Sequence, residues 1–277
     1  MTDSQLSELT GLAGLKESRA QLEDWLAVVR AERAREDLGM MVSRPTWKNL
    51  VFTGGPGTGK SYAARAVASA YADFGFLRGG QVLEAAAAGM AGWTVRETRQ
   101  LVNEAIGRAM GRMLMITGAQ AWRDMQDGGA AVLAALYEEM TAAGHGLALV
   151  LSGEAGPVGE LLGAHRPLAA RFAAVVSFPG YEPSDLGAAF ARLADEAGFT
   201  LGDGVQALAA NVLAFEAQGG RGSARLAVDL LSMATVAQAR RIAVDGGSPV
   251  TITAADIPDR LDDRFRAPDC WRPGQYL

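Results

Sequence analysis

Eight consecutive residues, Gly54 to Ser61, constrain the fold of this chain more than any other feature. They read Gly-Gly-Pro-Gly-Thr-Gly-Lys-Ser and fit the pattern G-x-x-x-x-G-K-[ST] without a mismatch. The glycines let the backbone curl so that successive N–H groups face phosphate oxygens, and the N-terminus of the next helix adds partial positive charge. Lys60 would reach the β- and γ-phosphates of ATP, and the Ser61 hydroxyl would ligate Mg²⁺. The candidate nucleotide-binding residues are Gly55, Pro56, Gly57, Thr58, Gly59, Lys60, Ser61 and Tyr62.

The surroundings of this loop predict an α/β fold. A short apolar run at 49–53 precedes the loop and suits a buried strand, and an alanine-rich helix is expected at 61–74. Strands alternating with helices are typical of a parallel sheet that lies between helix layers. The further strands are expected at 80–88, 113–117, 147–152 and 173–178, and the further helices at 15–38, 94–110 and 129–143.

The pattern changes after the breaker pair Pro179 and Gly180. Only helices are expected beyond it, at 184–198, 204–217, 223–243 and 254–265, with Thr253 as the cap of the last one. We therefore predict a nucleotide-binding domain with its N-terminal helix at 1–180, a small all-helical lid domain at 181–265 and a C-terminal tail at 266–277.

Composition and charge exclude several function classes. The formal net charge is −5 and the sequence pI is about 5.2, which argues against a domain-wide surface for nucleic acid. The N-terminal residues lack the apolar stretch of a signal peptide, and no apolar run is long enough to span a bilayer. We expect a cytoplasmic protein without a membrane partner.

The strand expected at 113–117 does not end as ATP hydrolysis requires. An Asp that holds Mg²⁺ and a Glu that polarises water are commonly found at such a strand end, but Thr117 and Gly118 stand there. Asp124 and Asp127 follow in an expected loop, and Glu154 follows the next strand. We favour the interpretation that each of these three residues is a solvated loop carboxylate, although the recruitment of one of them to the nucleotide site stays open.

Several motifs together resemble the CbxX/CfqX branch of AAA+ proteins, which includes red-type Rubisco activases and the ATPase domain of some type VII secretion components. The resemblance runs from about Leu9 to Leu261 and includes the Phe52–Ser61 segment. The opening Leu9-Thr10-Gly11-Leu12, followed by Leu15-Lys16, is similar to the family segment that lines the adenine pocket. It implies that Gly11 and Leu12 contact the nucleotide.

Two arginines take their roles from the same resemblance. The segment Pro167–Phe172 is similar to the family's arginine-finger segment, which makes Arg171 the candidate finger that acts in trans on a neighbouring subunit. The segment Gly222–Arg225 resembles the start of the sensor 2 helix, with Arg225 as the sensor. A surface arginine before a strand and a helix-surface charge are the alternatives for Arg171 and Arg225.

The departures from the family decide between two functions. The family's Asp-Glu pair is replaced by Thr117 and Gly118, and its pore-loop aromatic, near the position of Met90, is absent. Trp93 is displaced from that site; it could take the pore role, but a buried or capping tryptophan is the commoner outcome.

We expect a ring-forming ATP-binding subunit, assembled with itself or an AAA+ paralogue, that hydrolyses ATP weakly or not at all. The alternative is an ATP-driven protein-remodelling chaperone of the Rubisco-activase type. In either case the resemblance implies ATP and Mg²⁺ as cofactors.

Overall fold

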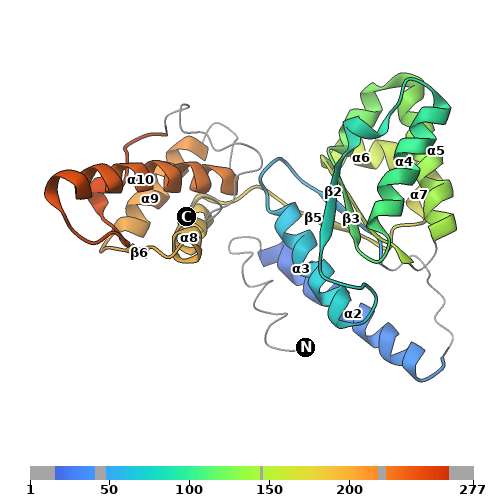
Figure 1. Ribbon diagram of the computed structural model, residues 1–277, viewed down its shortest axis with the longest axis horizontal. Helices are drawn as coiled ribbons and strands as arrows, with labels where there is room; N and C mark the ends of the chain where they lie inside the picture. Colours follow the sequence, from blue (N-terminus) through green and yellow to red (C-terminus); the bar gives the residue numbers. More distant parts are fainter. Residues whose placement is uncertain (1–15, 41–47, 144–145, 218–222, 262–277) are drawn as a thin grey trace. The chain divides into compact units, whose positions relative to one another are not determined.

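A computed structural model describes residues 16–40, 48–143, 146–217 and 223–261. The chain divides into two compact units, the first made mainly of residues 17–178 and the second of residues from Pro179 onward. Figure 1 labels the helices and strands of both units, and each unit is described here by itself.

The first unit is built on a five-stranded sheet in which every neighbouring pair of strands is parallel. The strand order is β2-β3-β4-β1-β5, so β1 lies between β4 and β5. Runs of apolar side chains with almost no polar interruption form these strands, as expected when helices cover both faces of a parallel sheet. The strands are β1 (Leu50–Thr53), β2 (Val82–Ala86), β3 (Met113–Thr117), β4 (Ala148–Gly153) and β5 (Ala174–Ser177). The predicted α/β class is confirmed.

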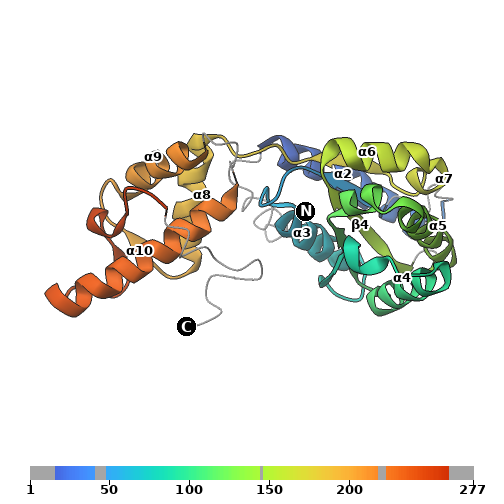
Figure 2. The same cartoon turned by 90° about the horizontal axis from the view of Figure 1, so that it is seen from above.

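Helices cover both faces of this sheet. Helices α2 (Lys16–Asp37) and α3 (Lys60–Asp73) lie on one side in Figure 1, and α4 (Val95–Ala109) and α5 (Gln126–Ala143) lie on the other. The predicted helices 15–38, 61–74, 94–110 and 129–143 correspond to these four, with bounds that differ most at the start of α5. Figure 2 shows the same layers from above.

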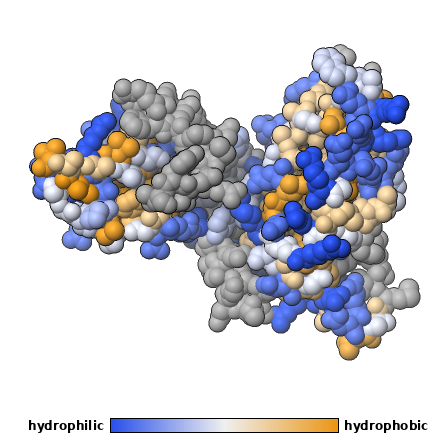
Figure 3. Space-filling view, viewed as in Figure 1, coloured by the Kyte–Doolittle hydropathy of each residue, from blue (hydrophilic) through white to orange (hydrophobic). Residues whose placement is uncertain are grey.

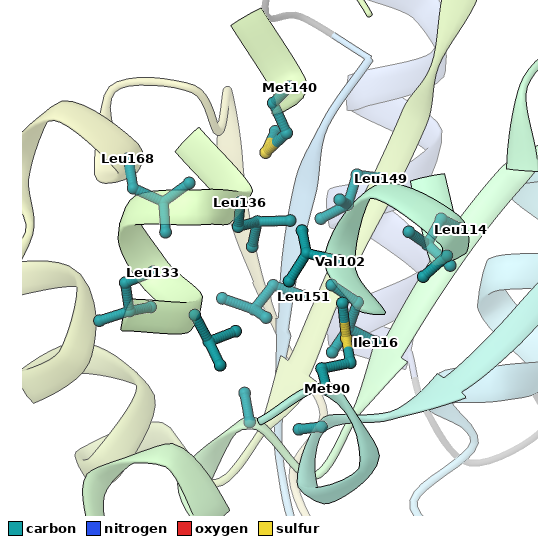
Figure 4. Close-up of a cluster of buried hydrophobic side chains, with 14 of the residues drawn as sticks. Met90, Val102, Leu114, Ile116, Leu133, Leu136, Met140, Leu149, Leu151 and Leu168 are labelled. Carbon is teal, nitrogen blue, oxygen red and sulfur yellow. The ribbon is translucent and has the colours of Figure 1, made fainter. Parts of the chain in front are cut away.

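Alternate residues of the central strands build the main hydrophobic core. Leu114 and Ile116 of β3, with Leu149 and Leu151 of β4, point to the face that α4 and α5 cover (Figure 4). Because successive side chains of a strand point to opposite faces, the residues between them pack on the other face. Met113 and Met115 are such residues, and both are buried.

Helix α2 is fastened to the sheet and to α3 by buried polar contacts. The Ser18 hydroxyl donates to the Ser177 carbonyl at 2.6 Å, and Trp25 Nε1 donates to the Tyr71 hydroxyl at 2.9 Å. Tyr71 of α3 is completely buried. Burial raises the pKa of the Tyr71 phenol well above its ordinary value, while the bond from Trp25 acts in the opposite direction. The phenol therefore stays neutral, and its oxygen depends on Trp25 for a partner.

Two short helices between β4 and β5 were not expected from the sequence. Helix α6 (Ala155–Ala164) and the one-turn α7 (Arg166–Ala169) contribute Val158, Leu161 and Leu168 to the main core. Their sequence contains three glycines in α6 and a proline in each helix, so its intrinsic helix propensity is low. Tertiary packing, which no local pattern reports, therefore stabilises both helices.

The segment after β3 also differs from the expectation. It forms the 3₁₀ helix η2 (Ala119–Asp124), and the preceding β2 is followed by the 3₁₀ helix η1 (Ala87–Met90). Trp122 of η2 is buried, and its Nε1 donates to the Ala87 carbonyl at 2.7 Å. Asp124 ends η2 and Asp127 lies in α5, so the prediction of a loop for these two residues is wrong.

The second unit contains three long helices, α8 (Pro183–Glu196), α9 (Val205–Ala217) and α10 (Ala224–Asp245). The prediction of an all-helical unit is wrong in one respect. The strands β6 (Thr200–Leu201) and β7 (Thr251–Ile252) pair in parallel and form a small sheet. Strands of two residues carry no readable alternation of polar and apolar side chains, which is why the sequence does not reveal them.

The helix predicted at 254–265 is wrong within the described residues. Only the 3₁₀ turn η4 (Ala254–Asp256) forms, with Thr253 and Asp256 closing a capping box around its start. Ile257 then adopts φ −88° and ψ 118°, an extended conformation imposed by the proline that follows it. Asp256 is 1% exposed and receives two hydrogen bonds from the Arg241 guanidinium, at 2.8 and 2.9 Å. This pair ties η4 to α10.

The visible surface of the first unit is largely hydrophilic over α4 and α5 (Figure 3). Among the helices that the structure describes, none combines the length and the apolar character that a membrane crossing requires.

Candidate functional site

The loop between β1 and α3 has the backbone that its glycines predict. Gly54, Gly57 and Gly59 have φ values of 154°, 70° and 88°, and Gly59 is the left-handed N-cap of α3. A Cβ added at Gly54 would lie 2.2 Å from the Phe178 carbonyl oxygen. Both the conformation and the close approach of β5 therefore require glycine, and the loop leads directly into a helix N-terminus.

Lys60 opens α3 and folds back over the loop. Its Nζ donates to the Gly54 carbonyl at 2.8 Å and to the Gly55 carbonyl at 2.5 Å. Burial lowers the pKa of the Lys60 ammonium below its ordinary value, and the negative charge of Glu154 acts in the opposite direction. The ammonium therefore lies beside the loop and within the electrostatic reach of one carboxylate.

The sheet order brings the end of β4 against this loop. Thr53 pairs with Gly153 in register, and the Gly54 N–H donates to the Gly153 carbonyl at 3.0 Å. The next residue, Glu154, is the N-cap of α6, but its side chain makes no capping hydrogen bond. The Glu154 N–H instead donates to Oε1 of Gln120 at 3.4 Å.

The end of β3 lies one strand further from the loop and carries no carboxylate. Thr117 is half-buried, and its hydroxyl donates to the Ala85 carbonyl at 3.5 Å. Gly118 adopts a left-handed conformation with φ 73° and ψ 36°. The glutamine that follows in η2, Gln120, is the first side chain beyond this strand end that can accept or donate a strong hydrogen bond.

The oxygen atoms near the loop are suitable ligands for the Mg²⁺ ion that accompanies a nucleotide. Mg²⁺ prefers oxygen ligands and is commonly held by one or two carboxylates together with substrate phosphates. Ser61 supplies a hydroxyl from the first turn of α3, and Glu154 is the carboxylate that acts on the neighbouring Lys60. Within the described residues, no group of three His, Cys, Asp or Glu side chains could hold a metal without such phosphates.

Arg171 lies between α7 and β5 and is held against α5. Its Nη2 donates to the Thr141 hydroxyl at 2.7 Å, and its guanidinium lies 5.1 Å from the centre of the Tyr137 ring. The Arg171 carbonyl accepts from Nδ2 of Asn49 at 3.0 Å. These contacts hold a half-buried arginine against α5.

The other candidate residues are not brought together within one unit. Arg225 lies in the first turn of α10, in the second unit, and is half-buried. Gly11 and Leu12 lie outside the described residues. Pro56 and Gly57 are exposed, Thr58 is buried, and Tyr62 is half-buried in the first turn of α3.

Trp93 is not buried, which contradicts one of the two outcomes expected from the sequence, a buried or a capping tryptophan. It is 98% exposed in the link between η1 and α4. The link is nevertheless well ordered by capping: the Trp93 N–H donates to Glu97, and the Glu97 N–H donates to the Thr94 hydroxyl. Its neighbour Val95 is 67% exposed. The indole is therefore presented to solvent on a fixed backbone.

Most of the first unit matches a known protein family. Residues 50–178 match the family described as "ATPase family associated with various cellular activities (AAA)". The chain is similar to Stage V sporulation protein K of Bacillus subtilis, with 26% identity over 70% of this chain and 61% of that protein. It is 29% identical to ESX-1 secretion system protein EccA1 of Mycobacterium tuberculosis, over 65% of this chain and 32% of that protein. The chain thus spans less than two thirds of both of these curated relatives.

A third relative matches over nearly the whole chain. The chromosomal protein CbxX of Cupriavidus necator is 26% identical over 95% of this chain and 86% of that protein. Among solved structures, a mutant of Thermotoga maritima RuvB aligns with a TM-score of 0.57 and 16% identity, covering 86% of this chain and 67% of that one. This likeness shows the fold alone.

Proposed function

We propose that this chain, whose residues 50–178 match the AAA family, binds Mg-ATP at the Gly54–Ser61 loop and hydrolyses it slowly or not at all. The observation that carries the proposal is the contrast between two neighbouring strand ends. β1 leads into a complete phosphate-binding loop, whereas β3 ends in Thr117 and Gly118, without a carboxylate.

Binding and hydrolysis depend on different atoms of such a site. Binding uses the backbone N–H groups of the loop, the α3 N-terminus and the Lys60 charge, all of which this chain retains. Hydrolysis requires in addition a group that orients or deprotonates water, and loss of such general-base assistance costs typically about 10²–10⁴-fold in rate. Gly118 has no side chain for this task, so the site is occupied but slow.

The role that fits these properties is a regulatory or structural ATP-binding subunit of a ring. Arg171 is a candidate to complete the site of an adjacent subunit, and Thr141 and Tyr137 of α5 hold its guanidinium in one orientation. Arg225, in the first turn of α10, is the candidate phosphate sensor. A second copy of this chain, or an AAA paralogue with an intact acidic pair, would be the neighbour.

Calorimetry and a steady-state ATPase assay on the purified chain test this proposal together. The parent protein should bind Mg-ATP and turn over well below roughly 1 s⁻¹, the low end of the ordinary enzyme range. Lys60→Ala should abolish measurable binding, because it removes the charge that holds the β- and γ-phosphates. Equal ATP affinity of the variant and the parent, or an ordinary turnover number that Lys60→Ala abolishes, would contradict the proposal.

One observation favours the alternative, an active protein-remodelling ATPase. Trp93 presents an exposed indole on a capped backbone, in the segment between β2 and α4 where the family's pore loop is expected. Tryptophan is enriched among residues that dominate protein–protein contacts. Turnover that a client protein stimulates, and that Trp93→Ala removes without changing ATP affinity, would favour this function over the regulatory one.

A further inference from the structure

The carboxylate missing from the end of β3 has a counterpart at the end of the adjacent strand. The order β3-β4-β1 places β4, rather than β3, directly beside the strand that enters the phosphate loop. Gly54 joins the two: its N–H donates to the Gly153 carbonyl at 3.0 Å, and its own carbonyl accepts from Lys60 Nζ at 2.8 Å. Glu154 follows Gly153 immediately, and its charge acts on Lys60.

The backbone of Glu154 is held in place by Gln120. Oε1 of Gln120 accepts from the Glu154 N–H at 3.4 Å. A Cβ added at Gly153 would lie 2.6 Å from the same Oε1 and 2.8 Å from Val158. The absence of a side chain at Gly153 therefore makes room for the carboxamide to cross the end of β4.

The carboxylate of Glu154 is exposed and is not used by its own helix. The Glu154 side chain makes no capping hydrogen bond with α6, so its oxygens are not engaged by the helix that it precedes. An exposed carboxylate beside a phosphate loop would repel ATP unless a cation lay between them. Mg²⁺, which prefers oxygen ligands and binds carboxylates together with phosphates, is such a cation.

We propose that Glu154, positioned by Gln120 across Gly153, supplies the carboxylate that holds the Mg²⁺ of bound ATP in place of the residue missing at Thr117. The proposal rests on ATP binding at the Gly54–Ser61 loop. Its consequence is a strong dependence of ATP affinity on Mg²⁺, because Glu154 attracts the Mg²⁺ complex and repels the free nucleotide. Gln120 acts as a positioning residue in this arrangement.

Calorimetric titration of the full chain with ATP, once with Mg²⁺ and once with excess EDTA, tests the proposal. The quantity compared is the ratio of the Kd in EDTA to the Kd with Mg²⁺. Glu154→Gln should reduce that ratio about 10-fold, the scale on which the removal of a metal-supporting group acts. The Glu154→Gln variant should bind ATP more weakly than the parent does when Mg²⁺ is present, and more tightly than the parent does in EDTA. Glu154→Asp should retain most of the ratio, and Gln120→Ala should lose part of it.

Glu160→Gln is the matched control, because it removes one negative charge from the same helix at a residue that pairs with Arg123 at 3.6 Å. The control should leave the ratio unchanged. An unchanged ratio in Glu154→Gln, or an equal fall in Glu160→Gln, would overturn the inference while ATP binding itself stands. A parent protein that binds no ATP in either condition would overturn the proposed function as well.

Discussion

Restoring an acidic pair at the end of β3 should convert this chain into an ordinary ATPase. The double change Thr117→Asp with Gly118→Glu introduces the two carboxylates at the strand end where hydrolysis commonly requires them. If only this chemistry is missing, turnover should rise by about 10²–10⁴-fold, the usual contribution of general-base assistance.

The structure sets the cost of this change in folding stability. Nothing lies within 4 Å of a Cβ added at Gly118, so the first side-chain atom there meets no steric clash. The cost is instead conformational, because Gly118 has φ 73° and ψ 36° and a residue with a Cβ in that region loses about 1–2 kcal/mol. Thr117 contributes one long contact of 3.5 Å to the Ala85 carbonyl, so its loss is minor. A protein with about 5–15 kcal/mol of stability tolerates this total.

Steady-state ATP hydrolysis and urea denaturation of the same samples check both parts. Gly118→Ala is the control that carries the backbone cost without a carboxylate, and it should lose about 1–2 kcal/mol of unfolding free energy with no gain in turnover. Adding Lys60→Ala to the double variant should abolish any gained activity. A folded double variant that binds Mg-ATP and turns over at the rate of the parent would refute the reasoning about this strand end.

Three further outcomes follow from contacts described above. Arg171→Ala should leave the ATP affinity of the single subunit unchanged but weaken ATP-dependent self-association roughly 10-fold, the scale of one charged hydrogen bond; light scattering that shows a monomer at every concentration of the parent with ATP would contradict it. Trp122→Phe should cost about 1–3 kcal/mol of unfolding free energy, because the buried Ala87 carbonyl loses its donor; urea denaturation measures it. Although burial acts to raise the pKa of Asp256, hydrogen bonds from Arg241 and Thr253 lower it below its ordinary value. The stability that depends on this ionised carboxylate is therefore present above about pH 4 and lost as pH falls through the lowered pKa, so the melting temperatures of Asp256→Asn and the parent should differ at pH 7 and converge as the pH falls below that pKa.

The features that the sequence predicted are those set by neighbouring residues. The glycines at 54, 57 and 59, with Lys60 and Ser61, fix the phosphate loop locally, and the apolar runs around them identify the strands. The helices α6 and α7 were missed because their stability comes from core contacts of Val158 and Leu168 with distant elements.

The part of the site that escaped prediction depends on strand order. Sequence reasoning looked for carboxylates after β3, favoured a solvated loop for Glu154 and left its recruitment to the site open. No local pattern reveals that β4 lies between β3 and β1, and this order alone brings Gly153 to within 3.0 Å of the Gly54 N–H. The sequence also left Trp93 undecided between burial, capping and the pore role, because burial depends on what packs nearby rather than on residue type.

The attachment of α2 implies that the boundaries of the family match are not those of the folding unit. The match begins at residue 50, yet Leu22, Leu26 and Val29 of α2 are buried within the first unit. Each contributes about 1.5–3 kcal/mol when it is removed from water. A protein trimmed to residues 50–178 would expose the apolar surface beneath α2 and leave the Tyr71 hydroxyl without Trp25, its hydrogen-bond donor. Any shortened version intended for crystallisation, domain exchange or fusion should therefore begin before Lys16.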